Sequence, residues 1–162
     1  MNSNRAVPYF LALVVVALDR WSKLAVVRHI PLYRRRQIIP GFFQLTHTEN
    51  PGAAFSLFAD SPPVWTSRAL IAFSLIALAV VAYLLSQQKR ALSRTSVALA
   101  LIMGGASGNL WDRLAHGRVV DFLLLYVGKY EWPVFNLADS CIVIGAGLLA
   151  LSVVTEKAPG SS

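Results

Sequence analysis

The sequence predicts a mainly α-helical integral membrane protein, a bundle of four transmembrane helices with a small β-rich part outside the membrane. Of the 162 residues, 56% are hydrophobic and only 14% are charged, which is too apolar for an ordinary soluble domain. Four apolar runs are long enough to cross about 30 Å of hydrocarbon, and runs in lipid must be helices because lipid satisfies no backbone groups. Between the first two runs lies a stretch of β-prone residues.

The four predicted spans are residues 7–27, 65–85, 96–115 and 134–154, and they form a single domain over residues 1–162. The first run begins like a signal peptide, with Arg5 before an apolar core. Asp19, Arg20 and Lys23 follow that core directly, however, and no small-residue cleavage pattern is present. We therefore expect this run to be retained as a helix.

Because successive spans alternate in direction, loops 28–64 and 116–133 lie on one side of the membrane and the termini on the other. In the first loop, residues 41–50 predict one or two short strands. The apolar stretch "PGAAFSLFADSPP" (51–63) is too short to span and predicts a short interfacial helix or re-entrant turn. Orientation stays open, because five Lys or Arg residues fall on the terminal side and six on the loop side.

Charge and side-chain composition exclude several classes of partner and cofactor. The net charge is +7, but there is no soluble domain to present a groove to nucleic acid, so contact with anionic lipid headgroups is favoured. The single Cys141 excludes an internal disulfide framework and a multi-cysteine metal site. His29, His47 and His116 lie far apart with no H-E-x-x-H pattern. We expect neither a metal nor another cofactor.

Polar residues that interrupt the apolar runs all fall at the loop face of the membrane, whichever way the protein is inserted. They end the first and third spans, begin the fourth, and are joined by one residue from each loop. They are Asp19, Ser22, Lys23, Asn109, Asp112, Arg113, Asn136 and Asp139 in the spans, with Asn50 and Asp121 in the loops. This convergence predicts one polar site.

Helical spacing predicts which faces of the third and fourth spans turn toward protein. These faces are Gly105, Asn109, Asp112 and His116 in the third span, and Asn136, Asp139, Ser140, Val143 and Gly147 in the fourth. Gly104 and Gly108 make a small-x-x-x-small seam that lets another helix approach closely. Asp19 with Lys23, and Asp112 with Arg113, are expected to form structural ion pairs.

Asp121 and Asp139 have no adjacent basic residue, which favours a chemical role over a structural one. Two acids close together in a low dielectric share one proton. An aspartic protease uses this arrangement: the ionised acid takes a proton from the attacking water, and the protonated acid donates to the peptide carbonyl. The structural alternative is an intramembrane acid that merely pairs with a base to lock the bundle.

Other candidate nucleophiles and other functions are less favoured by the sequence. Cys141 is typical of a packing residue, and Ser22 and Lys23 are adjacent in a helix, so their side chains diverge by about 100°. A small proton-coupled transporter or channel subunit needs polar residues through the full bilayer, yet residues 71–85 contain neither acid nor base. A structural assembly subunit would tolerate loss of the acids if charge pairs were kept.

Five blocks in order along the chain resemble the bacterial lipoprotein signal peptidase family, signal peptidase II. They are "DRWSK" (19–23), "NPGAAFS" (50–56), "GGASGNLWDR" (104–113), "VVDF" (119–122) and "FNLAD" (135–139). The resemblance implies an aspartyl endopeptidase of the bacterial inner membrane, and we expect the chain to act as a monomer. Such enzymes remove the signal peptide of prolipoproteins just before a diacylglyceryl-modified cysteine.

The resemblance also implies roles for individual residues. The catalytic acids would be Asp121 and Asp139. Residues that hold the acids or the substrate would be Asp19, Lys23, Asn50, Gly52, Asn109, Arg113, Asn136 and Ala138. The termini would be cytoplasmic, the site would face the outer leaflet, the strands would cradle the substrate, and the loop carrying "AAFSLFADS" would act as a lid.

Overall fold

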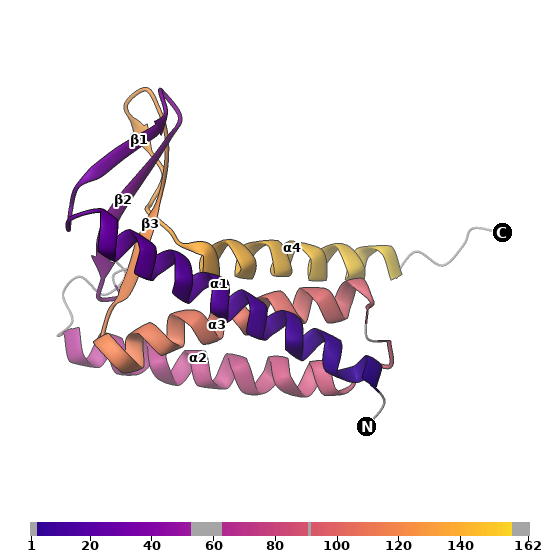
Figure 1. Ribbon diagram of the computed structural model, residues 1–162. Helices are drawn as coiled ribbons and strands as arrows, with labels where there is room; N and C mark the ends of the chain where they lie inside the picture. The colour runs from indigo at the N-terminus through magenta and orange to yellow at the C-terminus, as the bar shows by residue number, and fades with distance from the viewer. Residues whose placement is uncertain (1–2, 53–62, 91, 157–162) are drawn as a thin grey trace.

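The structure is a computed structural model that describes residues 3–52, 63–90 and 92–156. Within these ranges it contains a short 3-10 helix, four α-helices and four β-strands (Figure 1). Their bounds are η1 Ser3–Ala6, α1 Val7–His29, β1 Arg35–Ile39, β2 Phe43–Asn50, α2 Pro63–Ser86, α3 Arg94–His116, β3 Val119–Val127, β4 Tyr130–Glu131 and α4 Leu137–Glu156. The helices coincide with the four predicted apolar runs, shifted by a few residues at their ends. The predicted interfacial helix and lid fall mainly on residues 53–62, outside the described ranges.

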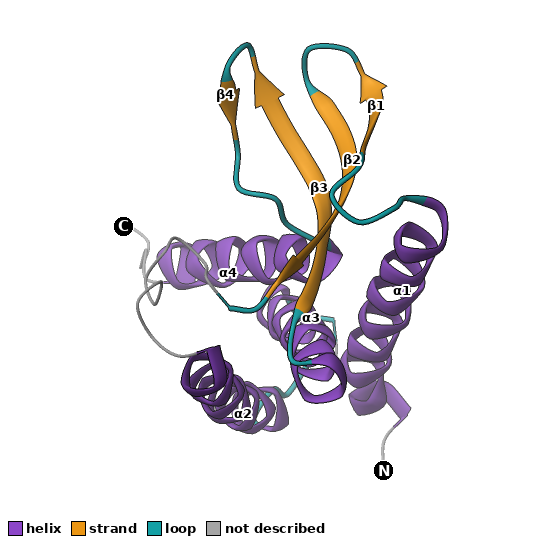
Figure 2. Cartoon of the chain, turned by 90° about the vertical axis from the view of Figure 1, so that its left-hand side faces the viewer, coloured by secondary structure: helices purple, strands orange, loops and turns teal. Residues whose placement is uncertain are grey.

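The four helices lie side by side, with the sheet at one end of the bundle and both termini at the other (Figure 1). The end view shows α3 between α1, α2 and α4, and α3 packs against each of these three helices (Figure 2). The chain therefore brings both long loops to one end of the bundle, as alternation of direction requires. The polar residues at the ends of α1 and α3 and at the start of α4 meet there.

The third helix is defined by local signals at both of its ends. Ser93 is the N-cap, and its side chain accepts from the Ser96 backbone N–H at 3.0 Å while the Ser96 hydroxyl accepts from the Ser93 N–H at 2.9 Å. Gly117 ends the helix in the left-handed conformation at φ 71°, which a residue without Cβ adopts at no steric cost. This fixes the length of α3 and hence the position of its polar last turns.

The predicted glycine seam of α3 is confirmed, and its partner is α1. A Cβ on Gly104 would lie 2.8 Å from the Ala12 carbonyl oxygen, and a Cβ on Gly108 would lie 2.6 Å from Asp19 Oδ2. Contacts that short are not tolerated, so the absence of side chains lets α1 approach closely enough to bury Asp19 against α3.

Gly108→Ala is expected to lower the free energy of unfolding by about 1–3 kcal/mol, since the added methyl group would press on the Asp19 carboxylate. Gly147→Ala is the matched control, because a Cβ there has nothing within 4 Å and alanine is the better helix former. Thermal unfolding in detergent measures both. Equal melting temperatures for the two variants would show that the seam does not set the α1–α3 distance.

The predicted buried face of α4 is wrong beyond Ser140. Val143 is 70% exposed and Gly147 is exposed, whereas Ala138 and Gly145 are buried. A Cβ on Gly145 would lie 2.7 Å from the carbonyl oxygen of Ala98, so this glycine, rather than the polar first turn, sets the face that packs on α3. In α3 the predicted face is confirmed except at His116, which is exposed at the end of the helix.

The strands form one antiparallel sheet in the order β1-β2-β3-β4. The strand expected within residues 41–50 is confirmed as β2, but β3, inside the second predicted loop, was not foreseen. "VVDFLLLYV" is a continuous apolar run, and such a run shows no alternation that identifies a strand. Phe122 packs with Val26 of α1 and with Ile30, which directly follows α1, so the base of β3 is anchored to the helices. Asp121 is thereby held at the end of the bundle.

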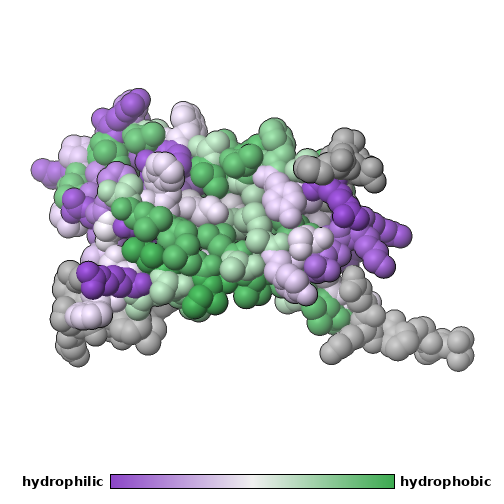
Figure 3. Space-filling model, turned by 90° about the horizontal axis from the view of Figure 1, so that it is seen from below, coloured by the Kyte–Doolittle hydropathy of each residue, from purple (hydrophilic) through white to green (hydrophobic). Residues whose placement is uncertain are grey.

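Two helical segments of the described chain, Trp65–Ser86 and Leu137–Thr155, meet the length and hydropathy expected of a membrane span. α1 and α3 are interrupted by charged residues near their ends. Seen from below, the molecule presents a broad apolar band with hydrophilic residues gathered at its two ends (Figure 3). This distribution suits a bundle whose middle lies in hydrocarbon.

Candidate active site

The two predicted acids converge at the sheet end of the bundle from different elements. Asp121 lies near the start of β3 and is buried, and Asp139 lies in the first turn of α4 and is half-buried. Asp121 pairs in register with Thr48 of β2, whose hydroxyl donates to the Asp121 carbonyl at 3.0 Å. Strand pairing thus fixes the backbone from which the Asp121 carboxyl group projects.

Asp139 is fixed by a reciprocal cap at the start of α4. The Asp139 backbone N–H donates to Asn136 Oδ1 at 2.9 Å, and the Asn136 backbone N–H donates to Asp139 Oδ2 at 3.2 Å. Unpaired backbone N–H groups at a helix N-terminus also favour a negative charge. The predicted fourth span, residues 134–154, contained Asn136. In the structure Asn136 precedes Leu137, the first residue of α4, and caps the first turn of the helix.

Asn136 connects the two acids through its side-chain amide. Its Nδ2 donates to Asp121 Oδ1 at 2.8 Å and to Asn109 Oδ1 at 3.1 Å. Asn109 Oδ1 also accepts from Lys23 Nζ at 3.0 Å, which leaves the Asn109 Nδ2 group to donate to Asp139 Oδ1 at 2.7 Å. The network therefore assigns both amide orientations and delivers one amide donor to each acid.

Asn50 is oriented in the same way from the end of β2. Its Oδ1 accepts from the Gly52 backbone N–H at 2.8 Å, so its Nδ2 donates to Asp121 Oδ2 at 3.2 Å. Gly52 has φ +115°, and a Cβ there would lie 2.5 Å from Leu70 Cδ1 of α2. Glycine suits this position because the positive φ is strained for any other residue, and a Cβ would also have to displace the end of the Leu70 side chain.

A buried cluster of charges lies beneath the acids, between α1 and α3. Lys23 Nζ lies 2.7 Å from Asp19 Oδ2, as predicted, and 2.9 Å from Asp112 Oδ2. The other oxygen of Asp19 accepts from the Ala138 backbone N–H at 3.0 Å, which ties α4 to α1. The predicted Asp112 pair with its neighbour Arg113 is wrong, because adjacent helical residues point in different directions.

Asp112 instead pairs with Arg20 of α1, which sequence reasoning left without a role. No short-range pattern connects residues 92 positions apart. Both residues lie near the loop end of a predicted span, and this shared position in the membrane was the feature of the sequence that could have suggested the pair.

Arg113 of α3 is a cation near the acids that has donor capacity left. Its Nη1 donates to the Asn109 carbonyl at 3.3 Å, while its buried Nε has no hydrogen-bond partner within the described residues. The carboxylates that act on its charge are Asp139, Asp121 and Asp112, in that order. A substrate carbonyl or carboxylate could take up the free donor.

Burial, and after it the negative charge of Asp139, raise the pKa of the Asp121 carboxyl group to about 6. Hydrogen bonds from Asn50 and Asn136, and the charge of Lys23, act in the opposite direction. Asp121 is therefore suited to hold a proton under mildly acidic conditions and to donate it.

The other candidate groups do not assemble a site. The Ser22 hydroxyl donates to the Asp19 carbonyl at 2.9 Å, and the contacts of Lys23 are to Asp19, Asn109 and Asp112 rather than to Ser22. Cys141 is half-buried in the apolar part of α4. Within the described ranges, no three His, Cys, Asp or Glu side chains are grouped as metal ligands would be.

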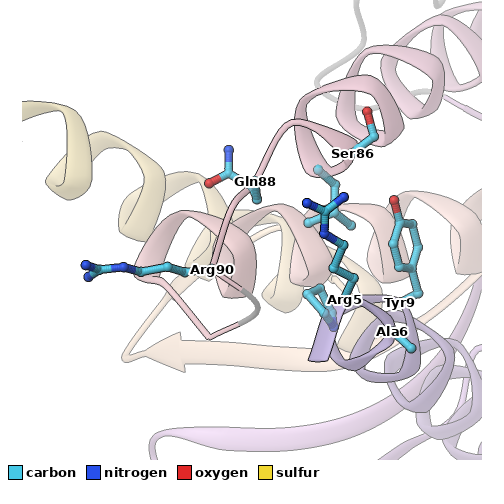
Figure 4. A pocket seen from close by; sticks show the side chains of 8 residues that line it. Arg5, Ala6, Tyr9, Ser86, Gln88 and Arg90 are labelled. Atoms are coloured by element: carbon cyan, nitrogen blue, oxygen red, sulfur yellow. The ribbon is translucent and has the colours of Figure 1, made fainter. Parts of the chain in front are cut away.

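A cavity of about 410 Å³ lies at the opposite end of the bundle, between the start of α1 and the end of α2 (Figure 4). Its lining residues are Arg5, Ala6, Pro8, Tyr9, Leu85, Ser86, Gln88 and Arg90. None of these is an acid, and Arg90 points away from the other labelled side chains (Figure 4). This cavity offers no group for acid–base hydrolysis, unlike the paired acids at the sheet end.

Comparison with known proteins connects this geometry to one enzyme family. The sequence profile described as signal peptidase (SPase) II matches residues 11–155. A protein named lipoprotein signal peptidase from Neisseria gonorrhoeae is 43% identical over 159 residues, covering 96% of this chain and 93% of its own length. One of the same name from Solibacter usitatus is 40% identical over 150 residues, with 92% and 91% covered.

Solved structures agree with the sequence relatives. A structure described as a bacterial membrane enzyme, determined by the in meso method at 2.3 Å resolution, superimposes with a TM-score of 0.81 at 26% identity, covering 96% of this chain and 93% of that chain. A second, determined at 1.9 Å, gives a TM-score of 0.79 at 28% identity, with 90% and 91% covered. The chain is thus an aspartic peptidase and a membrane enzyme, and it belongs to the signal peptidase II family.

Proposed function

We propose that this protein is an aspartyl endopeptidase that cuts the signal peptide from prolipoproteins just before a diacylglyceryl-modified cysteine. One observation carries the proposal: two acids from different elements are joined at the end of a membrane bundle by two amides, since Asn136 donates to Asp121 and to the Asn109 oxygen while Asn109 donates to Asp139. The relatives named lipoprotein signal peptidase supply the substrate class.

In the proposed mechanism Asp139 is the base and Asp121 is the acid. The Asp139 carboxylate accepts hydrogen bonds from the Asn136 backbone N–H at 3.2 Å and from the Asn109 side-chain amide at 2.7 Å, and these contacts orient it to take a proton from water. Asp121 is the more buried acid and holds the proton.

The reaction begins when water attacks the scissile carbonyl carbon. Asp139 takes the proton from water as the new C–O bond forms, and Asp121 gives its proton to the carbonyl oxygen. The tetrahedral intermediate then collapses: the C–N bond breaks, the leaving nitrogen takes the proton from Asp139, and the gem-diol returns a proton to Asp121. The pair ends with one proton, as it began.

The proposed setting is the inner membrane, with four spans, cytoplasmic termini and the site toward the outer leaflet. Asp19 and Lys23 of α1 and Asp112 of α3 are buried, while Phe10, Leu13 and Trp21 of α1 are exposed. Lipid would therefore meet apolar side chains on all four helices. A diacylglyceryl group could then stay in the bilayer while the scissile bond reaches the acids. We propose that the protein acts as a monomer.

A transporter function has less support, because the polar network is confined to the sheet end of the bundle. α2 exposes Phe73, Ile76 and Val80, and its residues 71–85 carry no acid or base.

The substrate assignment is tested with one precursor peptide in two forms, with and without the diacylglyceryl group on its cysteine. Purified protein in detergent is expected to cut the modified form at least about 100-fold faster, since acyl chains supply most of the proposed binding. Equal cleavage of both forms would refute the lipid requirement while leaving peptidase activity intact. No cleavage of either form would contradict the proposed function.

Asn50→Ala is expected to move the alkaline limb of the kcat/KM profile to higher pH by about 0.5–1 unit. The limb should lie near pH 6 in the unmodified protein, because activity needs Asp121 protonated and its pKa is about 6. The Asn50 hydrogen bond lowers this pKa, so its loss raises the pKa and keeps the acid protonated to higher pH. Gln37→Ala, which removes an exposed amide of β1, is the control and should leave the limb in place. An unmoved or lowered limb in Asn50→Ala would contradict the role of Asp121 as proton donor.

A further inference from the structure

Arg20 is a cation of α1 that touches neither acid of the pair, yet it is connected to one of them. Its guanidinium contacts Asp112 Oδ1 and lies 5.9 Å from the ring centre of Trp111, which faces outward at 57% exposure. The Arg20 side chain is 25% exposed, whereas Asp112 is almost fully buried. Arg20 therefore reaches from the outer surface of the bundle to a buried carboxylate.

The connection from Arg20 to the acid pair has three further links. Asp112 Oδ2 lies 2.9 Å from Lys23 Nζ and, this ion pair apart, has no hydrogen-bond partner within the described residues. Lys23 Nζ donates to Asn109 Oδ1 at 3.0 Å, and Asn109 Nδ2 donates to Asp139 Oδ1 at 2.7 Å. Each link is a polar contact of ordinary length between buried or half-buried groups.

The charges of this cluster balance only when Arg20 is counted. Asp19 and Asp112 contribute two negative charges, and Lys23 and Arg20 contribute two positive charges. Without Arg20, two buried carboxylates would compete for one ammonium group. Lys23 would then be drawn toward Asp112, and its contact with the Asn109 amide oxygen would weaken.

We propose that Arg20 is a positioning residue: by neutralising Asp112 it keeps Lys23 on the Asn109 oxygen, and so keeps the Asn109 amide donating to Asp139. The inference rests on the proposed function, because Asp139 matters here as the base. Other charged groups around the cluster are Arg113 from α3 and Asp121 from β3. Arg113 is next to Asp112 on α3, but the ion pairs of Asp112 within the described residues are with Arg20 and Lys23, so Arg113 does not replace Arg20.

The test compares Arg20→Gln, Arg20→Lys and Arg28→Gln in cleavage of a diacylglyceryl-modified precursor. Arg28 is the matched control, an exposed arginine of the same helix with no ion pair or side-chain hydrogen bond within the described residues. Arg20→Gln is expected to lower kcat about tenfold with KM changed less than twofold, since a displaced catalytic group costs rate rather than affinity. Arg20→Lys should restore most of kcat, and Arg28→Gln should match the unmodified protein.

A double variant separates positioning from general loss of structure. In Asp112→Asn the carboxylate that needs Arg20 is neutral, so adding Arg20→Gln to it should change kcat less than twofold further. If Arg20→Gln lowers kcat equally with and without Asp112→Asn, or raises KM instead, the inference is overturned. If Arg20→Gln alone fails to fold, the comparison of Asp112→Asn with the double variant decides the matter by the same criterion. Absence of cleavage by the unmodified protein would instead refute the proposed function itself.

Discussion

Asp121→Asn and Asp139→Asn are each expected to lower kcat for cleavage of a lipid-modified precursor by about 10³- to 10⁴-fold. Asparagine keeps the shape of each side chain but can neither take a proton from water nor donate one as a carboxylic acid does. The two losses should not add, because the acids act as a unit, and the double variant should be about as inactive as either single one.

Controls for these variants come from the same part of the chain. Cys141→Ala and Ser22→Ala are expected to keep kcat within about twofold, since neither side chain touches the acid pair. Both asparagine variants should remain folded in detergent. They are expected to lose only about 1–2 kcal/mol, because an amide instead of a carboxylate would meet Asn50 and Asn136 at position 121 and Asn109 at position 139. Turnover within tenfold of the unmodified protein by either variant would remove that acid from the mechanism.

Lys23→Met is expected to give the largest loss of stability, about 3–5 kcal/mol. Lys23 is 1% exposed and lies between Asp19 and Asp112, so its removal leaves Asp19 without a cation and Asp112 with Arg20 alone. An uncompensated buried carboxylate costs far more than the pair contributes when intact. Chemical unfolding in detergent, followed by circular dichroism, measures the change.

A second substitution tests the cause of this instability. Adding Asp19→Asn to Lys23→Met removes the uncompensated charge and should recover at least about half of the lost free energy. No recovery would mean that Lys23 stabilises the bundle by packing rather than by charge. A stability of Lys23→Met equal to that of the unmodified protein would contradict the buried cluster altogether.

The helical framework and the meeting of the polar residues were predictable from the sequence alone. Apolar runs of about 20 residues specify helices, and alternation of direction brings residues from loops and helix ends to one side. This alternation predicted that four polar residues meet at one end of the bundle: Asp121, Asp139, Asn109 and Asn136. It predicted no distances between them. The structure adds the contacts, above all the Asn136 amide that reaches Asp121 and Asn109.

The features missed have separate physical causes. β3 is buried on both faces at its base, so it carries no alternation to distinguish it from a helix. The packing face of α4 is decided by the close approach of Gly145 to Ala98, which the polar first turn does not report. The Arg20–Asp112 pair depends on how α1 is rotated against α3, and that rotation is set by the glycine seam.

In the proposed mechanism, Asp121 and Asp139 together hydrolyse a lipid-modified precursor. The most direct measurement is mass spectrometry of the products formed from one diacylglyceryl-modified precursor by the purified protein, Asp121→Asn and Asp139→Asn in parallel. We expect a single cut just before the modified cysteine with the unsubstituted protein, and no product above background with either variant at equal folded concentration. A cut at another position, or the same product from either variant at a comparable rate, would contradict it.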